Sequence, residues 1–359
     1  MAFSVLNYYL SGNTAKGYQS LIESNIEGVK TISLFGNYKL LKTELLKLVV
    51  ARWTKMEHSI EILHSATNKD YIEGVINRTI NLCIIDGNSN HDIDTSIIKD
   101  TFDLDDVLDN NFKEQNTEKI VDSENEILNN HLSAYEYYSK ALDIHDEWEE
   151  IYISNMNKKR ATEYIDEVIN LLLKETTFEK VGKERHRFFG AATADGPIDY
   201  VEQITESIGK RYFIKGRPGT GKSTLLKKLV VDGIKRGINV YVYHCGLDPN
   251  SLDMVILRDL DIVIFDSTAP HEYFPSKDND EIIDVYKEFI KPGTDELYSD
   301  QLEEIIKRYT VEINIGTDFL AKSKDIMRKM DSLYETNINK AQMREFILKF
   351  NSKLEEYEK

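Results

Sequence analysis

An eight-residue segment of the chain, Gly216 to Ser223, has the residue types and the spacing of a phosphate-binding loop. Its sequence GRPGTGKS fits the pattern G-x-x-x-x-G-K-[ST], in which glycines let backbone N–H groups turn inward around phosphate oxygens. Lys222 would bind the β- and γ-phosphates, and the Ser223 hydroxyl would be a ligand of Mg²⁺. The residues expected to contact a nucleotide are Gly216, Arg217, Pro218, Gly219, Thr220, Gly221, Lys222, Ser223 and Thr224.

A carboxylate placed to hold the metal follows in the same half of the chain. The apolar run DIVIFD predicts a buried strand that ends at Asp266. An aspartate at that place binds Mg²⁺ directly or through water in phosphate-loop proteins. We therefore expect Ser223 and Asp266 to be the metal ligands, with ATP and Mg²⁺ as cofactors. No glutamate follows Asp266 directly, which weakens a fast-ATPase interpretation and favours the kinase branch of the fold.

A second carboxylate, Asp248, follows the predicted strand NVYVYHC. Ligands of open α/β sheets bind at the carboxyl ends of the strands, and a carboxylate there can orient or deprotonate an acceptor hydroxyl. The candidate catalytic residues are therefore Lys222, Asp248 and Asp266. Asp253 is a rival for the role of Asp248, whose alternative role is to start a turn before Pro249.

A basic run, KERHR, contains two arginines that could complete the site, Arg185 and Arg187. An arginine from the other half of the chain is a second source of such a group. The alternative interpretation of the run is a solvated charged face.

The chain also repeats itself at a spacing of 180 residues. Without a gap, residues 31–94 align with 211–274 at fourteen identical positions, where unrelated sequences would give about four. TAKG upstream matches TADG, and YISNMNK downstream matches YETNINK. The repeat predicts two domains of one fold, 1–180 and 181–359, packed as a pseudo-dimer within the chain. Chance similarity between two α/β units is the alternative.

The first copy of the loop has lost two of its glycines. Lys39 and Leu41 stand where the second copy has Gly219 and Gly221. A branched side chain at Leu41 would lie where the backbone must approach phosphate. We expect domain 1–180 to be a degenerate copy that kept the fold and lost tight nucleotide binding. Weak binding through Lys42 and Thr43 is the alternative.

Several other polar residues recur in both copies, including the one whose loop has changed. We expect them to have structural or inter-domain roles rather than catalytic ones, because the degenerate copy keeps them. The recurring pairs are His64 with His244, Arg78 with Arg258, and His91 with His271.

The elements needed to position these residues alternate along each copy. In the second copy, strands are expected at 211–215, 239–245 and 261–266, and a helix at 222–237. The fold class predicted is α/β, a tandem duplication of a phosphate-loop NTPase with a parallel sheet and helices on both faces. Segments 95–180 and 275–359 read as helical extensions. The acidic stretch 101–130 is expected to be a mobile loop or lid.

Composition limits the classes of function. The formal net charge of −17 argues against non-specific binding to nucleic acid or to anionic membranes. Cys83 and Cys245 give no disulfide framework or CxxC metal site. The amino terminus lacks the pattern of a signal peptide, and no apolar run is long enough to span a membrane. We therefore expect a cytoplasmic protein whose partners are a nucleoside triphosphate and an unidentified small molecule or protein.

The motifs resemble those of a poorly characterised bacterial family of two-domain phosphate-loop proteins, described as ATPases or nucleotide-kinase-related proteins. GRPGTGKS, CGLDPNSLDM and DSTAPH match its pattern, with Arg217, Met254 and Ser267 at places where that family has glycine. The resemblance implies ATP binding and supplies no substrate.

Two functions follow from these observations. The first is an enzyme that hydrolyses ATP or transfers its γ-phosphate to an unknown small acceptor. The second is a slow nucleotide-dependent switch or scaffold that acts through binding. A DNA-linked ATPase is a third idea, disfavoured by the negative charge.

Overall fold

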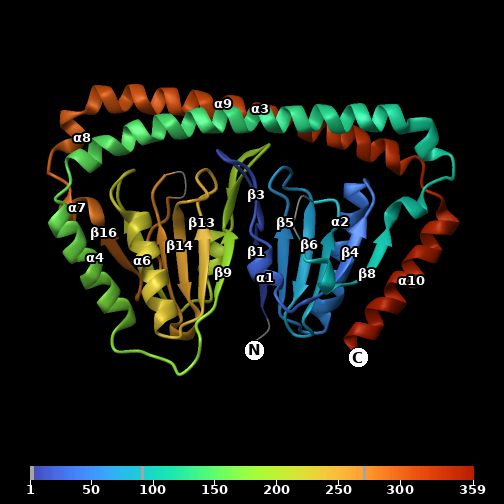
Figure 1. The fold of residues 1–359 in the computed structure, drawn as a ribbon, viewed down its shortest axis with the longest axis horizontal. Coiled ribbons are helices and arrows are strands. Elements are labelled where there is room, and N and C mark those ends of the chain that lie inside the picture. The colour runs from blue at the N-terminus through green and yellow to red at the C-terminus, as the bar shows by residue number, and fades with distance from the viewer. Residues whose placement is uncertain (1–3, 90–92, 270–271) are drawn as a thin grey trace.

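Two six-stranded sheets with the same strand order form the centre of the molecule (Figure 1). The computed structural model describes residues 4–89, 93–269 and 272–359. In the first sheet the strand order is β1 (Val5–Tyr8), β5 (Ile60–His64), β6 (Ile72–Asn77), β7 (Leu82–Asp86), β4 (Lys30–Phe35) and β8 (Ile98–Asp103). In the second it is β9 (Glu184–Phe188), β13 (Val240–His244), β14 (Leu252–Leu257), β15 (Ile262–Asp266), β12 (Lys210–Lys215) and β16 (Glu281–Asp284). The two equal orders agree with an internal duplication.

Each sheet is mixed, so the expectation of a parallel sheet is correct only in part. β6 and β14 run antiparallel to both of their neighbours, and the other neighbouring strands are parallel. The sequence reasoning did not recognise β14 as a strand. The connections on both sides of β14 are short, and a short connection can join only antiparallel strands.

The two halves meet at the edge strands β1 and β9. A pair of backbone hydrogen bonds joins them, from Tyr9 N–H to Phe188 O at 3.0 Å and from Phe188 N–H to Tyr9 O at 2.9 Å. Two hairpins lie beside this contact, β2 (Ser11–Thr14) with β3 (Gly17–Ser20) and β10 (Gly190–Thr193) with β11 (Gly196–Asp199). Tyr9 and Phe188 occupy equivalent positions in the two copies, so this contact has pseudo-two-fold symmetry.

Helices on both faces were expected, and both faces carry helices, although the two halves share the second face. One face of each sheet packs on a helix, α2 (Lys39–Lys55) in the first and α6 (Lys222–Lys235) in the second. Residues from both sheets share one core with the short helices α1 (Glu23–Ile26) and α5 (Val201–Thr205). The second face is thus buried against the other half of the chain.

Two long helices lie side by side across the strand ends of both sheets (Figure 1). These are α3 (Phe112–Ser154) and α9 (Ser299–Glu335). They pass closely where Gly316 faces Tyr138, since a side chain on Gly316 would meet the Tyr138 ring at 2.5 Å. The expectation of a mobile segment at 101–130 is wrong, because β8, the 3₁₀ turn η2 (Leu104–Val107) and the start of α3 form there. Phe112 packs on Tyr334 of α9, which gives this acidic segment a partner.

Because each long helix crosses to the other half, the helix that follows it packs against that other half. After α3, helix α4 (Lys158–Leu173) packs in the core of the second sheet with α6 and α7 (Val285–Phe289). After α8 (Thr294–Leu297) and α9, helix α10 (Lys340–Glu358) packs in the core of the first sheet. Each helical extension therefore completes the core of the other half. None of the helices in the described parts of the chain is long and apolar enough to cross a membrane.

Candidate functional site

The predicted phosphate-binding loop lies between β12 and α6, at the carboxyl edge of the second sheet. Asp266 ends β15, and β15 pairs directly with β12. The two motifs found far apart in the sequence are therefore neighbours, at the edge where open α/β sheets bind ligands. The long helices cover this edge (Figure 1).

The loop has the backbone conformation that its glycines predict. Gly219 and Gly221 have φ values of +72° and +82°, which side chains rarely adopt. Gly216 is needed for another reason, because a side chain there would meet Thr220 Oγ1 at 2.6 Å and Val285 at 2.8 Å. The buried Thr220 hydroxyl donates to the Arg217 carbonyl at 2.7 Å and holds the turn closed.

Lys222 and Asp266 face one another at the start of α6. The Lys222 Nζ lies 3.1 Å from an Asp266 carboxylate oxygen, and the same ammonium donates to Thr268 Oγ1 at 3.1 Å. Both side chains keep some exposure, 12% for Lys222 and 19% for Asp266. The Ser223 hydroxyl accepts the Leu252 N–H at 3.0 Å. A lysine, a hydroxyl and a carboxylate therefore meet at one helix end, and the hydroxyl and carboxylate are hard oxygen donors that suit Mg²⁺.

The other residues that were expected to contact a nucleotide differ in their exposure to solvent. Arg217 is exposed and forms an ion pair with Asp295, at 2.8 Å from its terminal nitrogen. Pro218 is half-buried and Thr224 is exposed. Arg217 thus points toward Asp295 in this conformation.

Asp248 lies at the edge of the same site. Its carboxylate accepts the Asn250 N–H at 3.1 Å, which is the turn role considered from the sequence. It also lies 3.2 Å from Lys16 Nζ, on the hairpin of the other half. Its rival Asp253 interacts with the half-buried Cys245.

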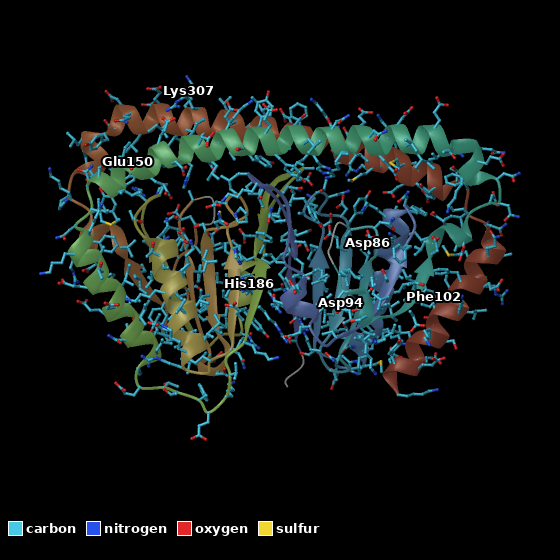
Figure 2. The ribbon with its side chains drawn as sticks, in the orientation of Figure 1. Asp86, Asp94, Phe102, Glu150, His186 and Lys307 are labelled. Carbon is cyan, nitrogen blue, oxygen red and sulfur yellow. The ribbon has the colours of Figure 1, made fainter. Side chains whose placement is uncertain are left out.

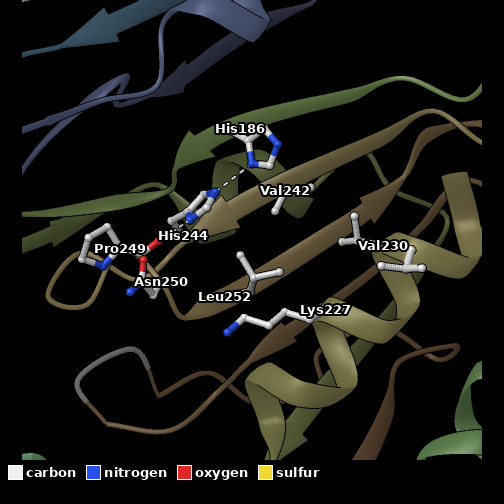
Figure 3. A pocket seen from close by; sticks show the side chains of 9 residues that line it. His186, Lys227, Val230, Val242, His244, Pro249, Asn250 and Leu252 are labelled. Atoms are coloured by element: carbon white, nitrogen blue, oxygen red, sulfur yellow. Dashed lines mark hydrogen bonds between the residues drawn. The ribbon is translucent and has the colours of Figure 1, made fainter.

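A shallow cavity of about 350 Å³ lies beside this turn, between α6 and β13 (Figure 3). Two histidines border it, and His186 Nδ1 lies 2.8 Å from His244 Nε2. Because His244 Nδ1 faces the Pro249 carbonyl at 2.6 Å, Nδ1 carries the proton and Nε2 accepts from His186. Its lining residues are His186, Lys227, Val230, Val231, Val242, His244, Pro249, Asn250 and Leu252.

Helix α3 contributes residues that sequence reasoning missed. A side chain on Gly219 would meet the Glu149 carbonyl at 2.5 Å, so α3 of the first half lies directly on the loop of the second. Glu150, the next residue, marks the end of α3 above the second sheet (Figure 2). His145, one turn earlier, has its Nδ1 at 3.7 Å from a Glu149 carboxylate oxygen. No sequence signal placed these residues here, because the crossing of α3 is a tertiary feature.

The equivalent loop of the first half has become helix. Helix α2 begins at Lys39, whereas α6 begins at Lys222, the equivalent of Lys42. Lys39 and the two residues after it are therefore helical where the second copy has its loop. The N–H of Leu40 donates to the carboxylate of Asp331 on α9 at 3.1 Å. This N–H therefore already has an acceptor within the protein.

Lys42 and Asp86 of the first copy form a buried ion pair. Lys42 Nζ is hydrogen bonded to the Asp86 carboxylate and lies 2.8 Å from Asn88 Oδ1. The side chains of Lys42 and Asp86 are only 1% and 6% exposed. Burial raises the pKa of Asp86, but Lys39 and Lys42 outweigh it and hold that pKa below its usual range. Asp86 lies within the first half (Figure 2).

Arg187, one of the two arginines expected to complete the site, has a structural role instead. Arg187 is fully buried, pairs with Glu61 of the first half at 3.0 Å, and lies between the rings of Tyr8 and Tyr241. Neither the site role nor the solvated face expected for it is correct. Arg185 donates to Tyr241 Oη at 3.1 Å.

Residues that recur in both copies lie at inter-element contacts. Arg78 pairs with Glu61 at 2.6 Å, and Arg258 lies over the Tyr241 ring. His64 Nε2 lies 2.7 Å from Asn7 Oδ1, in the place that His244 and His186 occupy in the second copy. The pair His91 and His271 lies outside the described residues.

Comparisons with protein-family models, with curated proteins and with solved structures gave no match to this chain. The structure by itself defines an α/β protein with two similar mixed six-stranded sheets and long connecting helices.

Proposed function

We propose that the second half binds Mg-ATP through its phosphate loop and either hydrolyses it or transfers its γ-phosphate to a small acceptor. The first half is then a degenerate copy that provides the other half of the fold. The resemblance to two-domain phosphate-loop proteins supports ATP as the nucleotide.

The observation that carries this proposal is the difference between the two loops. Gly219 and Gly221 give the second loop a positive-φ turn, the type of backbone conformation in which N–H groups can surround a phosphate. The equivalent residues of the first copy form a helical turn, and its lysine is buried on an aspartate. One chain therefore contains both a cradle suited to a triphosphate and a filled version of it.

Each residue of the site has a role in this proposal. Loop N–H groups and Lys222 would bind the phosphates and stabilise the charge that spreads over them during in-line transfer. Ser223 and Asp266 would hold Mg²⁺, whose positive charge offsets that of the phosphates. The Lys222–Asp266 ion pair would have to open on binding, which leaves the carboxylate for the metal.

Asp248 lies on the acceptor side of this arrangement. It follows β13, which is separated from β15 by the antiparallel strand β14, and the cavity bordered by His186 and His244 lies beside its turn (Figure 3). The cavity has apolar walls and a rim of histidine, lysine and amide groups, which suits a small acceptor with a polar end.

The second candidate function is a nucleotide-dependent switch. The packing of α3 on Gly219 favours it, because a ligand entering the loop must contact a helix that reaches the other half. Such a helix can convert binding into a change elsewhere in the molecule.

Product analysis with purified protein tests the proposal. Incubation with Mg-ATP is expected to release ADP, and the Lys222→Ala variant is expected to release none above background. ADP accompanied by free phosphate indicates hydrolysis, and stimulation by one metabolite indicates transfer. Tight Mg-ATP binding with no ADP in either protein would favour the switch.

A further inference from the structure

The nucleotide site of the second half is covered by a helix of the first half. Helix α3 touches the loop at Gly219 through the backbone of Glu149, and His145 lies one helical turn before that contact. The side-chain donor atoms of His145, Asp146 and Glu149 all lie within 4.8 Å of one another. The site is therefore built from both halves, and α3 brings an imidazole to it.

The surroundings of His145 give its two ring nitrogens different roles. Nδ1 lies 3.7 Å from a Glu149 carboxylate oxygen, too far for a hydrogen bond and close enough for an ion pair once the ring takes up a proton. The ring lies against Trp148 at 6.1 Å and Tyr309 of α9 at 6.0 Å between centroids. A carboxylate beside one nitrogen stabilises the positive charge that the ring gains when the other nitrogen takes a proton.

Charged groups of the phosphate site act on His145. Burial lowers the pKa of His145, Glu149 and Asp146 oppose that effect, and Lys222 lowers it further while Asp248 raises it. The net effect is a pKa below the ordinary value, so the ring is neutral near pH 7 and can accept a proton. Lys222 begins α6, and Asp248 lies in the turn after β13.

The first half provides an internal control. The repeated segments YISNMNK and YETNINK align α3 with α9. When this alignment is extended toward the amino terminus, Glu149 pairs with Asp331 and His145 pairs with Met327. The structure agrees, since Asp331 lies on the first loop as Glu149 lies on the second. Asp248 is likewise replaced, by Asn68. The degenerate copy keeps the fold without the imidazole, so the fold does not require it.

We propose that His145 is the proton acceptor for the attacking oxygen at this site, supplied by one half to the phosphate loop of the other. The inference rests on the proposed function. The hydroxyl of water or of the acceptor gives its proton to His145 Nε2 while its oxygen bonds to the γ-phosphorus. The bond from the γ-phosphorus to the β–γ bridging oxygen breaks, and ADP leaves with that electron pair. The imidazolium, paired with Glu149, then returns its proton to solvent.

Two His145 variants separate chemistry from binding. His145→Gln keeps a polar side chain of similar size, and His145→Met introduces the residue of the first copy. We expect both to bind Mg-ATP within about threefold of the parent, by calorimetry, and to lose 100-fold or more in kcat. The parent's kcat is expected to fall as the pH drops through the pKa of His145, below 6.5, and both variants to lack that limb. His131→Gln is the matched control, because His131 lies on the same helix and contacts Thr67 of the first half.

The outcomes separate this inference from the proposed function. His145 variants that keep the parent's turnover and pH profile overturn the inference alone. A parent that binds Mg-ATP without turnover also overturns it and leaves the switch. A parent that binds no Mg-ATP overturns the proposed function, and the inference with it. Equal melting temperatures of parent and variants without nucleotide show that lost turnover is not lost folding.

Discussion

The two loops of this chain stand at the same place in two copies of one fold and have opposite character. In the second, glycines with positive φ form a non-helical turn, and Lys222 keeps partial exposure to solvent. In the first, the helix starts three residues earlier, and Lys42 is buried on Asp86. Asp331 of α9 accepts a loop N–H there, so a carboxylate of this protein replaces the anion that such a loop would bind.

If the second loop binds a nucleotide as we propose, this difference shows how such a site can become a structural one. Lysine and leucine favour helix where glycine favours a turn, so replacing two glycines extends α2 backward over the loop. The charges left behind must then be paired inside the protein, because an unpaired buried charge is costly. The first copy also has a structural role, because its helix α4 packs in the core of the second sheet.

The largest expected effect comes from separating the copies. Residues 181–359 expressed alone lose α4, whose buried apolar side chains would cost of order 10 kcal/mol to remove, comparable with a whole domain's stability. We expect this fragment to lack cooperative thermal unfolding by circular dichroism. Co-expression with residues 1–180 is expected to restore a folded complex. A stable, fully active fragment would contradict the exchange of helices.

The next effect compares the two lysines without nucleotide. Lys42→Ala leaves Asp86 buried with less compensation and is expected to cost about 3–5 kcal/mol in the free energy of unfolding. Lys222→Ala, at a partly exposed pair, should cost about 1–2 kcal/mol. Chemical denaturation measures both, and Lys47→Ala, at an exposed pair with Glu44, is the control. Equal losses for Lys42 and Lys222 would contradict the difference in burial.

Acid should weaken the contact between the halves through Glu61, whose equivalent in the second copy is Tyr241. Burial raises the pKa of Glu61, but Arg187 and Arg78 outweigh it and hold that pKa well below the usual range. A lowered folded-state pKa gives stability that is present above the unfolded value of about 4.3 and lost as the pH falls below it. Glu61→Gln should therefore flatten the loss of stability between about pH 4 and pH 2. An unchanged slope would show that other carboxylates dominate.

The smallest effect is expected at Arg217. Its ion pair with Asp295 is exposed, so Arg217→Ala should change the free energy of unfolding by less than about 1 kcal/mol. Mg-ATP affinity should change by less than about threefold, because the Arg217 side chain is paired with Asp295 of α8. A tenfold loss of affinity in calorimetry would show that Arg217 turns to the phosphates on binding. Asp295→Ala, which frees Arg217, is the matched control.

The sequence predicted the parts of the site that depend on local chemistry. The glycine spacing around Lys222 predicts the loop, and the apolar run before Asp266 predicts the neighbouring strand, and both lie where expected. The repeat predicts two similar sheets, which the strand orders confirm. These features depend on residue type and spacing along the chain.

What the sequence could not predict depends on contacts between distant segments. Strand β14 follows a turn-rich segment, and its pairing makes each sheet mixed. Nothing in the periodicity of α3 shows that its last turns lie on Gly219 of the other half. Arg187 appeared in a charged run and is fully buried, because Glu61 and two tyrosine rings surround it.

A thermal-shift titration with Mg-ATP on the parent, Lys222→Ala and Lys42→Ala tests the asymmetry of the two copies most directly. At 100 times the dissociation constant, binding should stabilise the parent by about 2.7 kcal/mol. The Lys42 variant is expected to gain the same amount relative to its own, lower stability without nucleotide. The Lys222 variant is expected to gain none. Equal loss of the gain in both variants, or no gain in the parent, would contradict the account.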